Sequence, residues 1–131
     1  MLVRDLMNAG PAVISPREGL DQALALMAEH KNRHLMVVDA ATNVVGILSD
    51  QDIAMVYDPQ EMTQARWKAI LVEAVMTRHP VTIGSQASIE AAARMLLKEA
   101  VSALPVVDNG QLVGVLSDRD FTRHFARGNG S

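Results

Sequence analysis

The sequence of 131 residues contains no cysteine, which excludes a disulfide framework and any thiolate metal site. Aromatic residues make up only 3% of the chain, so a core has to be built from Val, Ile, Leu, Met and Ala. No apolar run approaches the length of a bilayer span, and the N-terminus lacks the layout of a signal peptide. These absences predict a cytoplasmic protein that does not enter a membrane.

A strong excess of charge is also missing. The formal net charge is −3, and this weakly acidic balance argues against an electrostatic grip on nucleic acid or on an anionic membrane surface. Hydrophobic residues account for 49% of the chain, as in an ordinary globular protein. The length suits one domain with a substantial core, or two half-sized units that share one.

What the sequence does contain is a long internal repeat. Gly-Ile-Leu-Ser-Asp-Gln-Asp at 46–52 returns as Gly-Val-Leu-Ser-Asp-Arg-Asp at 114–120, and Leu-Met-Val-Val-Asp at 35–39 returns as Leu-Pro-Val-Val-Asp at 104–108. The spacing between the copies shortens by one residue between these two runs, where a turn tolerates a change of length. Self-similarity on this scale determines the architecture before any propensity argument does.

Each copy predicts the order strand, helix, strand, strand, helix. Apolar residues recur at helical spacing from Leu20 to Met27 and again from Ile89 to Leu96, which indicates two amphipathic helices. Ser88 is a good N-cap for the second of these, whereas Gly19 stands at the matching position of the first. The remaining predicted elements are strands at 12–14, 35–38, 44–48, 81–83, 104–107 and 112–116, and helices that start at Ser49 and Ser117.

Between the copies, Asp58-Pro59 ends the preceding helix, and residues 61–71 are predicted to form a connecting helix. Trp67, in that helix, is expected to serve packing, and a subunit interface is one place for it because aromatic anchors are favoured there. The predicted organisation is therefore a first repeat at 1–57, a helical linker at 58–71, a second repeat at 72–127 and a disordered tail at 128–131.

The chemistry of the repeats turns on Ser-x-x-Asp, which occurs at 49–52 and again at 117–120. One interpretation is structural, because a serine at the N-cap with an acidic residue three positions on resembles a capping box, although the usual third residue is Glu or Gln. The acidic residue also suits the positive end of the helix dipole. Under this interpretation the motif only starts a helix.

The other interpretation is a ligand site, and it rests on the glycine before each motif. Gly46 and Gly114 interrupt β-branched strands, which weakens a strand unless something approaches the backbone closely. A glycine, a sharp strand-to-helix exit, a hydroxyl and free helix N–H groups together suit a phosphate. An ionised aspartate one turn on suits two sugar hydroxyls. The pattern favours a phosphorylated ribose, and capping stays open because a ligand can compete for the same donors.

Pro-x-x-Ile, an amphipathic helix, Leu-x-Val-Val-Asp and Gly-h-Leu-Ser-Asp-x-Asp (h, hydrophobic) thus occur twice in the same order. One such motif is moderately specific, whereas two complete copies are highly specific. The chain resembles a tandem pair of cystathionine β-synthase (CBS) domains, a Bateman module, from about Val3 to Arg127.

The resemblance implies a mixed α+β fold in which two β-α-β-β-α repeats pack sheet to sheet with pseudo-twofold symmetry. It also implies clefts between the repeats that hold adenosine derivatives of the AMP, ADP or ATP class. The Ser and Asp of the motif would contact phosphate and ribose, while main chain and apolar side chains would hold the base. In this family the base pocket can come from one repeat and the Ser and Asp from the other, so we expect mixed sites. The implied ligand-binding positions are Val13, Ile14, Arg33, His34, Leu35, Ser49, Asp50, Asp52, Thr82, Ile83, Ser102, Ala103, Leu104, Ser117, Asp118, Arg119 and Asp120.

The copies differ at several of these positions. The second has the family-like Ser-Ala-Leu-Pro at 102–105, whereas the first has the bulkier Arg-His-Leu-Met at 33–36, whose cationic side chains would either reach a phosphate or crowd the cleft. Arg119 stands where the first copy has Gln51, and arginine suits the geometry of phosphate. We therefore favour the half with Ser117 for a polyanionic ligand.

These observations predict a non-catalytic regulatory module for energy sensing, with an adenosine nucleotide as its ligand and with no cofactor or metal of its own. A Mg²⁺ ion beside the bound phosphate is compatible with the two Asp-x-Asp pairs. The expected partners are a second copy of the chain, as a homodimer, and an effector protein. Two alternatives stay open: a structural or protein-interaction module without ligand, and a Mg²⁺-dependent phosphate-transfer enzyme built on the same pairs.

Overall fold

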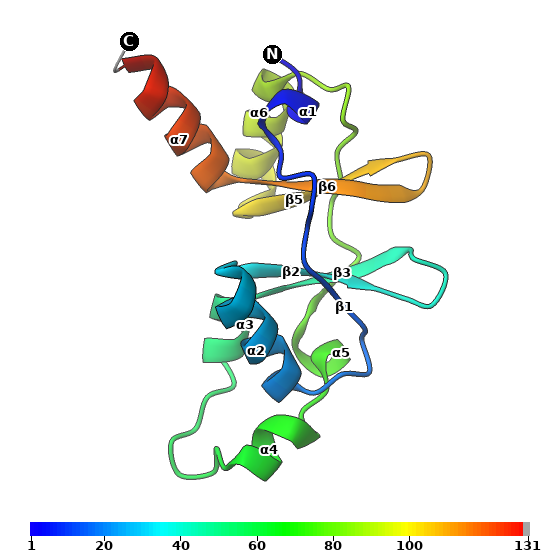
Figure 1. The fold of residues 1–131 in the computed structure, drawn as a ribbon, viewed down its shortest axis with the longest axis vertical. Helices are drawn as coiled ribbons and strands as arrows, with labels where there is room; N and C mark the ends of the chain where they lie inside the picture. The colour runs from blue at the N-terminus through cyan, green and yellow to red at the C-terminus, as the bar shows by residue number, and fades with distance from the viewer. Residues whose placement is uncertain (130–131) are drawn as a thin grey trace. The chain divides into compact units, whose positions relative to one another are not determined.

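The computed structural model describes the backbone of residues 1–129 and the side chains of residues 1–127. The chain divides into two compact units, one of residues Ala12–Pro80 and the other of Met1–Pro11 together with the chain from Val81 onward (Figure 1). Neither unit is one continuous repeat. Each combines the body of one repeat with the short segment that begins the other.

The unit of residues 12–80 contains a four-stranded sheet in the order β1-β2-β3-β4. The first pair is parallel and the other two are antiparallel. Helices α2 and α3 lie on one face of this sheet (Figure 1). The bounds are β1 Val13–Ile14, α2 Leu20–His30, β2 His34–Val38, β3 Val44–Ser49, α3 Asp50–Ala54, α4 Gln64–Ala69, α5 Val72–Val75 and β4 Thr77–Arg78.

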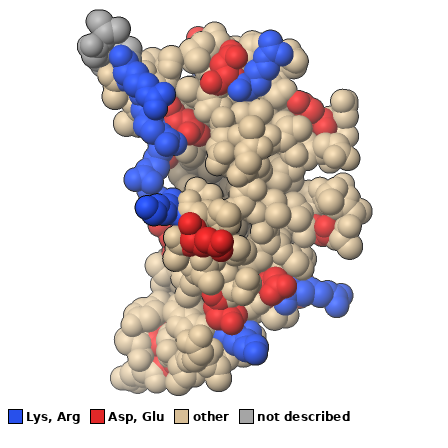
Figure 2. Space-filling model, viewed as in Figure 1, with Lys and Arg blue, Asp and Glu red and all other residues tan. Residues whose placement is uncertain are grey.

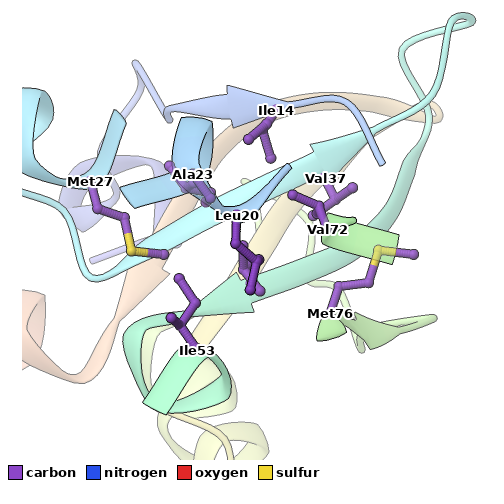
Figure 3. Packing of buried hydrophobic residues seen from close by; sticks show 10 residues of the cluster. Ile14, Leu20, Ala23, Met27, Val37, Ile53, Val72 and Met76 are labelled. Carbon is purple, nitrogen blue, oxygen red and sulfur yellow. The ribbon is translucent and has the colours of Figure 1, made fainter. Parts of the chain in front are cut away.

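The core of this unit forms between the sheet and the helices (Figure 3). Leu20 of α2, Val37 of β2 and Ile53 of α3 are buried there, as the apolar spacing predicts. Val72 and Met76, which begin the second repeat in sequence, belong to the same cluster. The start of the second repeat therefore completes the core of the first.

The other unit has an antiparallel hairpin of β5 and β6 as its sheet. Single bridges extend it on both sides, Asn8 with Val115 and Ile83 with Val106, at positions that match β4 and β1 of the other unit. The predicted strand at 81–83 is thus wrong, because only Ile83 pairs with the hairpin. The bounds are α1 Val3–Leu6, α6 Ile89–Glu99, β5 Ala103–Asp108, β6 Gln111–Ser117 and α7 Asp118–Asn129.

In the same way, the segment that begins the first repeat completes the core of this unit, so the two repeats exchange their first segments. Val3 of α1 is fully buried in a cluster with Leu104 and Leu116, and its N–H donates to the carbonyl oxygen of Ala87 at 2.8 Å. The sequence did not reveal α1 or α5, because four-residue helices are too short for an apolar period. Each buries one valine completely, and the N–H of that valine donates to a carbonyl oxygen elsewhere in its unit.

Most predicted helix starts are confirmed. Ser88 caps α6 by accepting the N–H of Ala91, and the helices after the hairpins follow directly on Ser49 and Ser117. The linker helix is shorter than predicted, because Thr63 caps it and the chain is extended again at Ile70. None of the helices within residues 1–129 combines the length and the apolar character that a membrane span requires.

Trp67 of α4 packs against the core of its unit and stacks on Tyr57, with ring centroids 6.3 Å apart. This confirms the prediction that the single tryptophan serves packing. At the C-terminus, α7 continues through Asn129, two residues into the stretch predicted to be a tail. The last two residues of that predicted tail lie outside the described residues.

Candidate functional site

In both units, the hairpin register brings the start of one strand beside the Ser-x-x-Asp motif. His34 pairs with Ser49, and the N–H of Asp50 donates to the carbonyl oxygen of Arg33 at 3.0 Å. In the other unit Ala103 pairs with Ser117, and an equivalent bond of 2.9 Å joins Asp118 to Ser102. Residues far apart in the sequence therefore meet twice in the same way.

In the first repeat the motif forms a complete capping box. The hydroxyl of Ser49 accepts the N–H of Asp52 at 3.1 Å, and Oδ2 of Asp52 accepts the N–H of Ser49 at 2.9 Å. The capping interpretation is therefore confirmed here, with Asp in the place of the usual Glu or Gln. The same carboxylate has a second oxygen, and Asp52 is only half-buried.

In the second repeat the carboxylate is more fully engaged. Oδ2 of Asp120 accepts the N–H of Ser117 at 2.8 Å and the Ser117 hydroxyl at 3.3 Å. Oδ1 accepts a charge-assisted bond of 2.7 Å from Nη2 of Arg123. The Asp120 side chain is 10% exposed and that of Arg123 is 67% exposed. The position that corresponds to Arg123 in the first repeat is Met55, which has no donor to offer.

The first repeat places its arginine on the other carboxylate of the motif. Nε of Arg33 lies 3.1 Å from Oδ2 of Asp50, and both side chains are nearly half exposed. In the second repeat the position of Arg33 is Ser102, so Asp118 has no such arginine. An arginine therefore pairs with the first aspartate of Asp-x-Asp in the first repeat, which is Asp50, and with the second aspartate in the second repeat, which is Asp120.

The positions implied for the base divide into exposed and buried ones. Val13 and Thr82 are exposed, as are Arg33 and Ser102, and His34 is half-buried. The side chains of Ile14, Leu35, Ile83, Ala103 and Leu104 are buried, four of them within the two apolar cores. These buried residues stay candidates only through their main-chain groups.

The glycines before each motif serve packing. A Cβ at Gly46 would lie 2.4 Å from Sδ of Met76, and a Cβ at Gly114 would lie 2.6 Å from Sδ of Met7. Something does approach each strand closely, as the sequence predicts, but it is the methionine of the exchanged segment. The glycines therefore give no independent support for a phosphate site.

The helix starts offer few free donors to a phosphate. The N–H of Asp50 donates to the carbonyl oxygen of Arg33, that of Asp118 donates to Ser102, and that of Asp52 donates to the Ser49 hydroxyl. Cationic side chains near the motifs are the other groups to which an anion can bind. Figure 2 shows Lys and Arg atoms in a run over α7, the helix that carries Arg119, Arg123 and Arg127.

Sequence reasoning did not identify Arg123 as a partner of Asp120. The signal was available, since residues three apart on a helix are neighbours and Arg123 follows Asp120 at that spacing. Within the described residues, no three His, Asp or Glu side chains are grouped as metal ligands would be.

Asp108, at the end of β5, holds the loop that carries Thr82. Its Oδ1 accepts the N–H of the buried Ser85 at 2.9 Å, and its Oδ2 accepts the Ser85 hydroxyl. The side-chain bond first, and the backbone bond second, lower the pKa of Asp108 below the ordinary value of 3.8. In the first repeat Asp39 instead accepts the N–H groups of its own turn, those of Ala41 and Asn43.

Comparison with family models matches the CBS domain twice, at residues 3–58 and 72–127. The chain belongs to the CBS domain family. The CBS domain-containing protein YhcV of Bacillus subtilis is 30% identical over 115 residues, which cover 88% of this chain and 79% of that protein. The mixed α+β fold with two CBS repeats is thereby confirmed.

Solved structures of CBS pairs agree with this fold. CBSX2, a CBS-pair protein of Arabidopsis thaliana, in complex with AMP is 30% identical with a TM-score of 0.81, covering 98% of each chain. The CBS domain pair of protein MJ0100, in complex with 5′-methylthioadenosine and S-adenosyl-L-methionine, is 25% identical with a TM-score of 0.83, again over 98% of each chain.

Several relatives are much longer enzymes. L-aspartate semialdehyde sulfurtransferase of Methanocaldococcus jannaschii is 27% identical over 95% of this chain, which is 23% of that protein. Homoserine O-acetyltransferase of Methanocorpusculum labreanum is matched over 23% of its length as well. The chain therefore spans less than a quarter of the length of these two enzymes.

Proposed function

We propose that this CBS pair is a non-catalytic regulatory module that binds an adenosine nucleotide of the AMP, ADP or ATP class. The observation that carries the proposal is the repeated meeting of a strand start with Ser-x-x-Asp, at Ser49 and Asp52 in one unit and at Ser117 and Asp120 in the other. CBS pairs in complex with AMP and with two other adenosine compounds lend support.

In this proposal each aspartate accepts the ribose hydroxyls, and arginines hold the phosphate. Asp52 offers the carboxylate oxygen that its capping bond to Ser49 leaves over. Arg33 in one unit and Arg119 in the other are exposed enough to turn toward a phosphate. Main-chain groups near Val13 and Thr82 hold the base. That each ligand bridges the two repeats stays a prediction of the family resemblance.

Regulation then follows from linkage between binding and conformation. A ligand favours the arrangement of the chain that binds it most tightly, by no more than the difference between its affinities for the alternatives. A role in energy sensing, a homodimer, an effector protein, a cytoplasmic location and a Mg²⁺ ion beside the phosphate all stay predictions of the same proposal.

Thermal melting with AMP, ATP, S-adenosylmethionine and adenosine tests the proposal. We expect the melting temperature to rise with ligand concentration, because a ligand that binds only the folded chain stabilises it. Asp52→Ala and Asp120→Ala are each expected to remove the response of the half that they disable. Because both substitutions also remove a helix cap, each ligand response is measured against the same variant without ligand.

Ser88→Ala is the matched control for lost capping. Ser88 caps α6 in the same way as Ser49 caps α3, but it lies outside the candidate site. This variant should melt earlier and keep the full ligand response. A panel that leaves the wild-type melt unmoved at millimolar concentration would support the structural or interaction module. Steady turnover of ATP in the presence of Mg²⁺ would support the enzyme.

A further inference from the structure

The Ser117 half has a feature that the Ser49 half lacks. The guanidinium of Arg123 already occupies Oδ1 of Asp120, and Ser117 takes Oδ2 with two donors. A ribose hydroxyl that is to bond with Asp120 therefore meets a carboxylate with both oxygens engaged. In the first repeat the matching residue is Met55, which has no donor to offer Asp52.

We infer that Arg123 is a specificity-determining residue, which makes binding at the Ser117 half depend on an anionic group of the ligand; this rests on the proposed function. The ribose takes over Oδ1 of Asp120, and the displaced guanidinium turns to the ligand's phosphate. A nucleoside without phosphate breaks the ion pair and offers Arg123 no other anion.

The geometry makes this exchange feasible. The Arg123 side chain is 67% exposed, so water competes for the guanidinium and the pair with Asp120 is easily exchanged. Asp120 itself is 10% exposed and stays fixed by Ser117. One partner of the pair is thus immobile and the other is a long flexible side chain. Guanidinium binds phosphate through two parallel bonds, which replace the single bond of 2.7 Å to Oδ1.

The inference is tested by comparing how tightly two ligands bind at the Ser117 half when the Ser49 half is disabled. We would use the whole chain with Asp52→Ala, which disables the Ser49 half, and measure the affinities for AMP and for adenosine by calorimetry. Arg123→Met copies the residue of the first repeat. This variant is expected to bind AMP more weakly and adenosine more tightly. The affinity for AMP divided by the affinity for adenosine should therefore fall by at least about tenfold. The ratio cancels a general loss of stability, because both ligands meet the same variant.

Arg127→Met is the matched control, since Arg127 is exposed on the same helix one turn further on and should leave the ratio unchanged. The reciprocal variant Met55→Arg, in the Asp120→Ala background, should raise the ratio at the Ser49 half. An equal ratio with Arg123 and with Met at position 123 would overturn the inference while leaving AMP binding, and so the proposed function, intact. A wild type that binds neither ligand would overturn both.

Discussion

The two repeats share one Ser-x-x-Asp motif and place their positive charge on it differently. The first repeat bonds Arg33 to Asp50, at the entrance to its helix, and leaves Asp52 with its capping bonds. The second repeat bonds Arg123 to Asp120 and has Ser102 where the first has Arg33. Duplicated sequence has thus kept the cap and changed the electrostatics, so the two halves should differ in ligand preference more than in fold.

A second contrast concerns the helix that follows the first strand of each repeat. Gly19 precedes α2, while Ser88 caps α6. A Cβ at Gly19 would lie 2.4 Å from the carbonyl oxygen of Lys68 in α4, because the linker helix packs against this point. The first repeat therefore lacks the better cap for a steric reason that its own sequence does not contain.

The largest effect is expected from exchanging these two residues. Gly19→Ser, although it introduces a good N-cap, should destabilise the protein by about 3 kcal/mol because main chain has to move away from the new Cβ. Ser88→Gly should cost only about 0.3 kcal/mol, since glycine is nearly as good an N-cap. Urea denaturation of both variants measures the difference. A Gly19→Ser variant as stable as the wild type would show that the linker helix does not hold its position.

The next effect tests whether each strand needs a glycine because a methionine packs against it, Met76 against Gly46 in one unit and Met7 against Gly114 in the other. Gly46→Ala should cost about 2 kcal/mol, because the new Cβ lies against Met76. In a background with Met76→Ala the same change should cost at least about 1 kcal/mol less, since the sulfur is gone. Denaturation of the four proteins of this cycle gives the coupling. The cycle of Gly114 with Met7 is the matched control, and coupling in only one unit would contradict the equivalence of the two exchanges.

A smaller difference is expected between the two motif aspartates. Asp120→Ala should cost about 2 kcal/mol and Asp52→Ala about 1 kcal/mol, because Asp120 is buried and accepts three donors whereas Asp52 is half-buried and accepts one. Thermal melts without ligand measure both. Equal losses would mean that the bond from Arg123 adds nothing to the free protein.

The smallest effect is a dependence of stability on pH that arises from Asp108 in the second repeat. Because the pKa of Asp108 is lowered in the folded chain, this residue stabilises the fold above its unfolded pKa, and the contribution is lost as pH falls through the lower folded value. The difference in stability between wild type and Asp108→Asn should therefore be constant near neutrality and shrink in acid below about pH 4. Urea denaturation of both proteins across this range measures the difference, and a difference that stays constant into acid would contradict the lowered pKa of Asp108.

Much of the fold was predictable because it depends on local patterns that the repeat states twice. The spacing from Leu20 to Met27 predicted α2, and Ser88 predicted the start of α6. The hairpins and the helices after Ser49 and Ser117 followed from alternation and turn chemistry. The predicted strand at 81–83 failed because its pairing is limited to Ile83, which depends on the neighbouring strand rather than on its own sequence.

The candidate site was predictable in its members and less so in its bonding. The residues that meet at Ser49 and Ser117 could be named from the repeat and from the family resemblance. The role of the glycines was misread, because the close approach comes from Met76 and Met7, far along the chain. Arg123 was missed because its bond depends on a rotamer choice that the spacing allows and does not require.

The sequence by itself therefore determined the duplication, the order of the hairpins and of the helices that flank them, the two capping motifs and the family, since all of these depend on spacing and residue type. Only the tertiary structure decided which segment completes which core and which aspartate each arginine neutralises. Val3 and Val72 are buried in the body of the other repeat, and such contacts between distant segments depend on packing in space. The difference between the two halves of the candidate site arises at this second level.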